Sequence, residues 1–593
     1  MISGPRQPGN DIDVYLKPLI DDLKLLWEEG VDVYDSYSQE LFCLRAMLFC
    51  TINDFPAYGN LSGYSVKGHF ACPMCEKNTS YIQLKHGQKT VYTRHRKFLP
   101  RNHPYRRMKK AFNGSPEDEV VARSRNGEEI YNQVENIDIV FGKHPKKKTT
   151  EKSIWKKRSI FFNLPYWCKL DVRHCIDVMH VEKNVCDSVI GTLLNVKGKT
   201  KDGVKARQDL AEMGIRSELH AQSIGRRTYL PPACHTLSRK EKQIFCECLR
   251  SVKVPQGYSS NISSLVSMQD SKLVGLKSHD CHVLMQQLLP VAFRAILPTS
   301  VRGILTRLCM FFNAICKKVI NPRVLDDLEN EAIRLLCQLE MYFPPSFFDI
   351  MVHLIIHLVR EIRLCGPVFL RWMYPVERYM KILKGYVKNQ YRPEASIIER
   401  YIAEEAIEFC SSYMPSCEPI GVPKTRHEGK CEGKGVRGVK IQSVSRKLVD
   451  QAHLYILNNT VEKKVYATPN VSETLLRLAR GPSNDVITYG GQARQIFYVI
   501  DPANQKLSVV LEGRNMHVND DEDCLDILET TSFSSRTIQD KVDDVTDDIH
   551  AIRSDHNEGM TSSGSDQEGP GRSVTRLPDV TNRRERMPVH IDP

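Results

Sequence analysis

The pattern of apolar and polar positions predicts an amphipathic helix near the start of the chain and shorter elements after it. Over residues 11–30, apolar side chains recur at three- and four-residue spacing: Leu16, Leu19, Ile20, Leu23 and Trp27. Residues 41–53 form a nearly unbroken apolar run that stops at Asp54, which fits a helix end or a buried strand leading into a turn. Residues 56–80 contain Gly and Cys and are expected to form a loop, and residues 160–195 turn apolar again.

The middle of the chain is more regular. Residues 276–410 carry apolar positions at helical spacing, in segments that Pro, Gly or Asn separate, which predicts a large all-α bundle. A Gly/Lys-rich linker is expected at 413–445, followed by a small domain remnant at 446–514 in which alternating β-prone runs suggest a hairpin. Residues 515–593 are acidic and then Ser/Gly-rich, so a disordered tail is expected. The predicted fold class is therefore α+β with a helical middle.

Composition narrows the class of protein. The 593 residues are 41% hydrophobic and 26% charged, as in ordinary globular proteins, and no apolar stretch approaches the roughly 20 residues of a membrane helix. The N-terminus has no apolar signal core, which argues against secretion. Nineteen cysteines are scattered through apolar segments, a pattern typical of reduced thiols in an intracellular protein. The net charge of +12 is a weak indication of a polyanionic partner.

The motif Cys72-Pro-Met-Cys75 is the sharpest local signal. Two thiolates on a tight turn can occupy two tetrahedral positions around Zn²⁺, although a pair of ordinary buried or redox cysteines is the alternative. Because the chain has no second CxxC, we expect histidines to complete the site. His174 and His180, on either side of Asp177, are the best candidates.

Two other histidines lie at metal-binding spacing. His353 and His357 are four residues apart on an apolar helix, so they share one face. Neither has an acidic neighbour of the HExxH kind, so core histidines are the favoured interpretation.

Four acids are candidates for divalent-metal chemistry. Asp54 ends an apolar segment and suits a hard cation such as Mg²⁺, although an acid before a turn is more often a helix cap. Asp177 and Glu182 are five residues apart, which favours a cap followed by a solvated Glu. Glu377 follows Pro375 in what looks like the first turn of a helix, where an ion pair is the alternative.

Two basic stretches are candidates for DNA contact. Residues 92–110 mix Lys and Arg with Tyr, Phe and His, and residues 143–158 are rich in Lys. Cations would contact phosphates and aromatic rings could stack on bases. The alternative is a solvated loop with a nuclear-localisation role.

Several long sequence segments, in the same order along the chain, resemble one protein family. GPRQPGNDIDVYLKPLIDDLKLLWEEGVDVYD, TINDFPAYGNLSGYSVKGHFACPMC and RSIFFNLPYWCKLDVRHCIDVMHVEKNVCDSVIGTLLN, all within residues 1–200, resemble plant CACTA (En/Spm-type) DNA transposases. Residues 276–412 resemble the helical domain of unknown function that usually follows, with 201–275 as a connecting region. GQARQIFYVIDPANQKLSVVLE resembles part of a further domain associated with plant transposons.

The resemblance implies a ribonuclease H-like core that cuts and joins DNA with two Mg²⁺ or Mn²⁺ ions held by an Asp-Asp-Glu set. Asp54 would be the second acid. The third would be an acid of the Asp177–Glu182 phrase or, with a slight preference, Glu377, if the helical region is an insertion in the nuclease fold. Transposon-end DNA and a nuclear location are implied as well.

One departure from the family pattern bears on activity. The family's first acid lies in a phrase like Asp-Gly-Phe-Asn-Pro-Phe, and no such phrase precedes Asp54 here. We therefore expect an N-terminally truncated, partial ribonuclease H-like core that is catalytically incomplete. The alternatives are a non-enzymatic protein that binds zinc and DNA, and a scaffold that self-associates through its helical domain.

Overall fold

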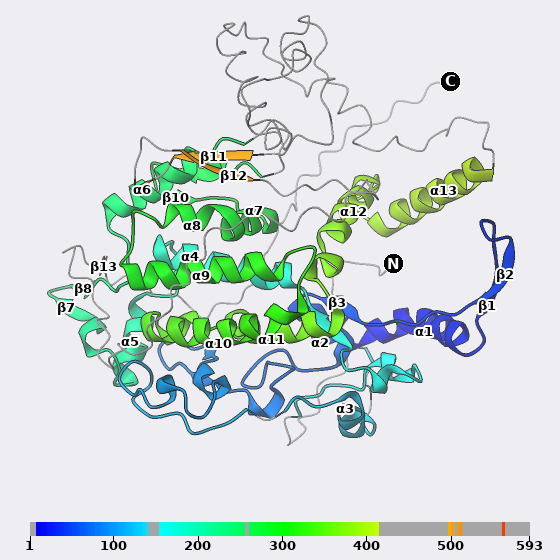
Figure 1. Ribbon diagram of the computed structural model, residues 1–593, viewed down its shortest axis with the longest axis horizontal. Helices are drawn as coiled ribbons and strands as arrows, with labels where there is room; N and C mark the ends of the chain where they lie inside the picture. Colours follow the sequence, from blue (N-terminus) through cyan, green and yellow to red (C-terminus); the bar gives the residue numbers. More distant parts are fainter. Residues whose placement is uncertain are drawn as a thin grey trace, which may run out of the picture.

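The computed structural model describes residues 8–121, 123–137, 153–254 and 260–413, with short pieces at 139, 141–142, 496–500, 502–503, 508–512 and 560–563. Small sheets of two or three strands surround and adjoin a helical middle (Figure 1). The predicted α+β class and the helical middle are confirmed. The described residues do not form the continuous sheet of a ribonuclease H-like core.

The N-terminal elements begin with the predicted amphipathic helix, α1, which spans Ile12–Glu28. The apolar run at 41–53 is divided between two strands: β2 (Glu40–Leu44), which pairs with β1 (Val31–Asp35) in an exposed hairpin, and β3 (Thr51–Asn53). Helix α2 (Phe55–Ser62) follows, so the expected loop at 56–80 begins as a helix. The capping side chain of Asp54 starts this helix, because its Oδ1 accepts a hydrogen bond of 2.7 Å from the backbone N–H of Ala57.

The most informative strand pairing is between segments about 120 residues apart. Strand β3 runs parallel to β6 (His174–Ile176), with Thr51 opposite His174 and Asn53 opposite Ile176. Helix α4 (Val178–Leu193) follows β6 as α2 follows β3, and Asp177 caps it as Asp54 caps α2. Two strand–helix units therefore lie side by side, with an acid at the same point of each.

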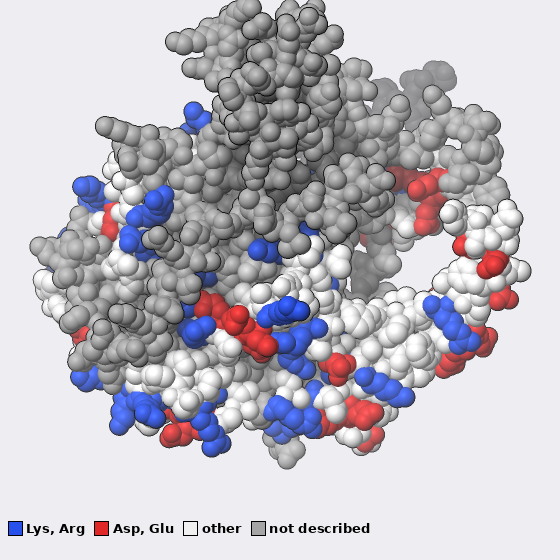
Figure 2. Space-filling model, viewed as in Figure 1, with Lys and Arg blue, Asp and Glu red and all other residues white. Residues whose placement is uncertain are grey.

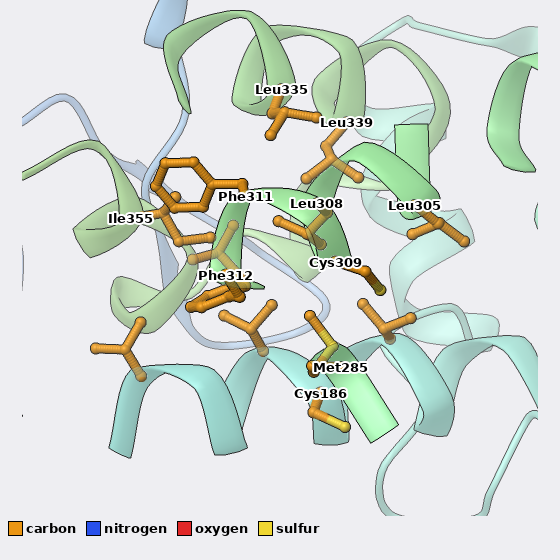
Figure 3. Close-up of a cluster of buried hydrophobic side chains, with 14 of the residues drawn as sticks. Cys186, Met285, Leu305, Leu308, Cys309, Phe311, Phe312, Leu335, Leu339 and Ile355 are labelled. Carbon is orange, nitrogen blue, oxygen red and sulfur yellow. The ribbon is translucent and has the colours of Figure 1, made fainter. Parts of the chain in front are cut away.

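The helical middle has a shared core. Helix α4 packs against α7 (Ser278–Val283) and α11 (Ile350–Cys365). Helix α10 (Leu325–Tyr342) packs against both α9 (Thr299–Ile315) and α11 (Figure 1). Large apolar side chains from α4, α9, α10 and α11 meet in the interior, with Leu308, Cys309, Phe311, Phe312 and Leu339 among them (Figure 3). Because α4 belongs to the N-terminal part, the helical bundle and the strand–helix units bury one continuous core.

The remaining elements connect these parts. The helices are α3 (Gly127–Val134), α5 (Val204–Glu212), α6 (Arg239–Arg250), α7 (Ser278–Val283), a π-helical turn at Leu284–Leu288, α8 (Leu289–Ala292), α9 (Thr299–Ile315), α10 (Leu325–Tyr342), α11 (Ile350–Cys365), α12 (Tyr374–Gly385) and α13 (Pro393–Tyr413). The short strands are β4 (Ile82–Gln83), β5 (Thr90–Val91), β7 (Gln222–Ile224), β8 (Arg227–Leu230), β9 (Val266–Ser267), β10 (Lys272–Leu273) and β13 (Met560–Ser563).

Near the C-terminus, the hairpin suggested within 486–512 is present as β11 (Ile496–Ile500) paired antiparallel with β12 (Ser508–Glu512). The expected linker at 413–445 and nearly all of the tail at 515–593 lie outside the described residues. Across the described part of the chain, every helix is too short or too polar to cross a membrane.

Candidate functional site

The thiols of the CxxC motif lie against two histidines of α11. His357 Nε2 is 3.3 Å from both Cys72 Sγ and Cys75 Sγ, and His353 Nε2 is 3.5 Å from Cys75 Sγ. All four side chains are buried, and their ligand atoms lie within 4.8 Å of one another. Tetrahedral Zn²⁺ with ordinary bond lengths places sulfur and nitrogen ligands about 3.5 Å apart. The donor set and its spacing therefore fit a closed Cys₂His₂ zinc site.

Local structure builds each half of this site. The turn Cys72–Cys75 is closed by the Cys75 N–H, which donates to Cys72 Sγ at 3.4 Å, and the Tyr64 hydroxyl donates to the Cys72 carbonyl at 3.1 Å. Helix α11 begins at its capping residue Asp349 and presents the two histidines one turn apart on the same face.

A chain of hydrogen bonds orients His353 from behind. His95 Nε2 lies 3.2 Å from His353 Nδ1, and His95 Nδ1 contacts the carboxylate of Glu340. The network is satisfied when both Nδ1 atoms carry the proton, because Glu340 can only accept. This arrangement leaves the lone pair of His353 Nε2 free to face the thiols. Glu340 therefore orients His353 through His95, whereas in many zinc sites a carboxylate bonds the metal-binding histidine directly.

Burial sets the charges of these ligands. Burial lowers the pKa of His353 to about 4, so its imidazole is neutral at pH 7 and can donate a lone pair. Burial raises the pKa of Cys72 well above its usual value, whereas a hydrogen bond from Cys72, with the nearby histidines, lowers the pKa of Cys75 well below it. The group therefore already favours one thiolate, and a bound cation would favour the second.

These contacts correct the predicted histidine partners. His174 lies in β6, where its Nδ1 is 2.7 Å from the hydroxyl of Thr51 and its ring meets Tyr58, Phe161 and Trp167 edge-on. His180 is half-buried on α4. The structure brings neither of them to the CxxC turn. It brings His353 and His357 there, which the sequence favoured as core histidines.

Three of the four candidate acids share one region. Asp54 and Asp177 follow the carboxyl ends of the parallel strands β3 and β6, and the Asp177 N–H donates to the Asn53 carbonyl at 2.7 Å. Burial, with a smaller contribution from the negative charges of Glu377 and Asp54, raises the pKa of Asp177 to about 7. Glu377 and Asp54 therefore lie close enough to Asp177 to repel it electrostatically. Glu377 is exposed in the first turn of α12, as its sequence context suggested.

The fourth acid, Glu182, has a different role. It is buried, and its carboxylate accepts hydrogen bonds from His282 Nδ1 at 2.7 Å and Gln286 Nε2 at 3.1 Å. These bonds join α4 to α7 and to the turn that follows α7. The expected solvated Glu is instead a buried bridge between helices.

The cations of the basic stretch at 92–110 are divided between the interior and the surface. Arg96 and Arg106 are buried and donate to backbone carbonyls, and Lys97 is buried as well. From the second stretch, Lys157 is buried against Asp13, whereas residues 143–152 lie outside the described part. On the face shown in Figure 2, Lys and Arg alternate with Asp and Glu over the described surface. Three cations of 92–110 therefore stabilise the fold from inside, whereas four others remain exposed at the surface: Arg101, Arg107, Lys109 and Lys110.

Two family models match the chain. Residues 1–137 match the transposase family tnp2, and residues 315–427 match a domain of unknown function (DUF4218). No curated protein and no solved structure matches the chain. The first match relates the chain to the transposases of transposable elements, in agreement with the resemblance found in the sequence. Cys72, Cys75 and Asp54 lie in the first matched segment, and His353, His357 and Glu377 lie in the second.

Proposed function

We propose that this protein carries the DNA-processing fold of a CACTA-type transposase, and that the helical domain supplies part of two metal sites. One is a structural Zn²⁺ site at Cys72, Cys75, His353 and His357. The other is a Mg²⁺ or Mn²⁺ site formed by Asp54, Asp177 and Glu377. The observation that carries the proposal is the arrangement of the acids, because two of them follow adjacent parallel strands and the third is within electrostatic range.

The chemistry follows from the donors. Carboxylate oxygens are the ligands that Mg²⁺ and Mn²⁺ prefer, and such ions would stabilise the attacking and leaving oxygens of a DNA phosphodiester. The helix cap holds one oxygen of Asp54 at the backbone and so fixes the direction of its carboxylate. Repulsion among the acids, which raises the pKa of Asp177, is relieved when a divalent cation binds. A protein that acts on chromosomal DNA in this way works in the nucleus.

Both proposed metal sites join the N-terminal part of the chain to the helical domain. If the helical domain were only an appendage, α11 and α12 would contribute nothing to the N-terminal sites. Instead α11 packs on α4 and carries both histidines, and Glu377 lies in the first turn of α12. We infer that the helical domain is an insertion that completes the fold of the transposase domain.

Metal binding tests the acid site most directly. We expect the full chain to bind Mn²⁺, measured by electron paramagnetic resonance, and Asp54→Asn and Glu377→Gln to weaken binding at least tenfold. Glu394→Gln, a half-buried acid in the first turn of α13, is the control and should bind as the unmodified protein does. Equal Mn²⁺ affinity in Asp54→Asn would overturn the acid site and leave the zinc site untouched.

DNA cleavage tests the activity itself. Duplex DNA carrying a transposon end is incubated with the protein and Mg²⁺ or Mn²⁺, and nicks are mapped at nucleotide resolution. Cleavage that depends on Asp54 and Glu377 would show that these acids suffice for catalysis, and it would overturn the expectation of a catalytically incomplete core. Salt-dependent DNA binding without cleavage, unchanged in Asp54→Asn, would favour the non-enzymatic protein that binds zinc and DNA.

A second proposal concerns self-association through α12 and α13. Helix α12 buries none of its residues, and apolar side chains stay exposed on both helices, including Met380 and Ile402 at 58% each. Apolar groups at this density favour contact with a second copy of the chain. Met380→Lys with Ile402→Lys should shift a sedimenting dimer to monomer. A monomer at all concentrations in the unmodified protein would contradict the proposal.

A further inference from the structure

A second group of thiols lies at the base of the two strands that lead to the acids. Cys50 immediately precedes β3, Cys175 is the middle residue of β6, and Cys365 is the last residue of α11. Their three sulfur atoms lie within 4.8 Å of one another, and Cys175 Sγ is 3.6 Å from Cys365 Sγ. All three are free thiols, so the sulfur atoms meet without being bonded to each other.

The spacing of these sulfurs matches metal coordination. A metal ion in the plane of three thiolates, with metal–sulfur bonds of about 2.3 Å, requires sulfur–sulfur separations of about 4.0 Å. One separation is 3.6 Å and the other two are at most 4.8 Å, a range that includes that value. A donor set made only of thiolates selects soft, thiophilic ions such as Cu⁺ and Zn²⁺ and disfavours Mg²⁺.

A buried cation lies within electrostatic range of the three thiols. The charge of Arg371 acts on Cys50, Cys175 and Cys365 alike. Arg371 is 7% exposed, its Nη1 lies 3.5 Å from Glu361, and its Nε and Nη2 have no hydrogen-bond partner among the described residues. Buried donors without acceptors are costly. A negatively charged metal–thiolate group within electrostatic range of this guanidinium would compensate its buried charge.

We propose that Cys50, Cys175 and Cys365 form a trithiolate site for a thiophilic metal ion, with Arg371 compensating the charge. The ion would bind β3, β6 and the end of α11 together, directly behind the acids that follow both strands. Cys50 and Cys365 are only half-buried, which gives the ion a route to the site. This site is separate from the Cys₂His₂ group, and it uses no ligand of that group.

Metal content tests the proposal. The full chain is purified with a thiol reductant, loaded anaerobically with Zn²⁺ or with Cu⁺, desalted and analysed by plasma mass spectrometry. We expect the unmodified protein to hold one thiophilic ion at each of the two sites. Cys365→Ser should lose one of these ions, Cys72→Ser should lose the other, and Cys410→Ser, an exposed cysteine outside both groups, should keep both. The two loading arms identify which ion the trithiolate site prefers.

A measurement on the unmodified protein keeps the test valid if Cys365→Ser does not fold. Bound metal should protect Cys50 and Cys365 from iodoacetamide, as read by peptide mass spectrometry, and removal of the metal should expose both. A single bound ion that only Cys72→Ser removes would overturn this inference while leaving the Cys₂His₂ site intact. Alkylation of Cys50 and Cys365 at equal rates with and without metal would overturn it as well.

Discussion

Replacement of Cys72 by Ser gives the sharpest test of how the N-terminal part and the helical domain are joined. In the Cys₂His₂ group the ligands come from a turn and from α11, with Cys72 and His357 separated by 285 positions in the chain. A bound Zn²⁺ therefore cross-links two distant segments, and it binds the folded state because only folding assembles the group. Serine preserves the size of the side chain and removes the soft donor.

The expected change in stability follows from the thermodynamic linkage between zinc binding and folding. A ligand at 100 to 1,000 times its dissociation constant stabilises the folded state by about 2.7–4.1 kcal/mol. For a folded unit of roughly 400 residues, the unfolding entropy is about 0.8 kcal/mol per degree, so the larger value corresponds to about 5 °C in Tm. We expect chelation to lower the Tm of the unmodified protein by roughly that amount.

The assay is differential scanning calorimetry with and without a chelator. Cys72→Ser should show a smaller chelator effect than the unmodified protein, because it has lost the Cys₂His₂ zinc and keeps only an ion bound by Cys50, Cys175 and Cys365. Cys309→Ser is the matched control, since Cys309 is equally buried but lies in the helical core away from the histidines. It should keep the chelator effect. A Tm of the unmodified protein that does not respond to chelation, although zinc is removed, would refute the cross-link.

Three other substitutions test contacts elsewhere in the fold and around the zinc ligands. Glu340→Gln should weaken zinc affinity roughly tenfold to a hundredfold, because it removes the carboxylate that holds His95 against His353. Competition with a chromogenic chelator measures this affinity, and an unchanged value would contradict the role of Glu340. Burial lowers the pKa of His174 to about 3, so the unfolded state takes up a proton below about pH 6.5 and the folded state does not. Stability should therefore fall as pH drops, with His174 accounting for up to about 2 kcal/mol between pH 7 and pH 5; urea unfolding of His174→Asn should show a smaller loss, and an equal loss would exclude His174 as the cause. Phe312→Ala, at a fully buried position, should cost about 3–5 kcal/mol, whereas Met310→Ala, 49% exposed on the same helix, should cost less than about 0.5 kcal/mol by the same assay.

Sequence patterns predicted the local features of this protein because those features depend on neighbouring residues. The spacing of apolar residues was sufficient for α1 and for the helices between 276 and 410, since helical packing repeats every three to four positions. The CxxC motif predicted half of a metal site, because two thiols on one turn need no distant partner to lie together. Asp54 fits the pattern of a helix cap, and it is one.

The partners of these features were decided only by tertiary structure. Nothing in the spacing along the chain distinguishes His174 from His353 as the partner of a thiol, since each is far from the CxxC turn, and only the packing of α11 beside that turn selects His353 and His357. The different roles of Asp177 and Glu182 likewise depend on α7, because His282 of α7 forms a hydrogen bond with Glu182 inside the core. The trithiolate group has no motif at all, because each cysteine comes from a different element. Sequence determines what each segment can form by itself, whereas contacts between segments depend on how hundreds of apolar side chains share one core, a choice that no local pattern encodes.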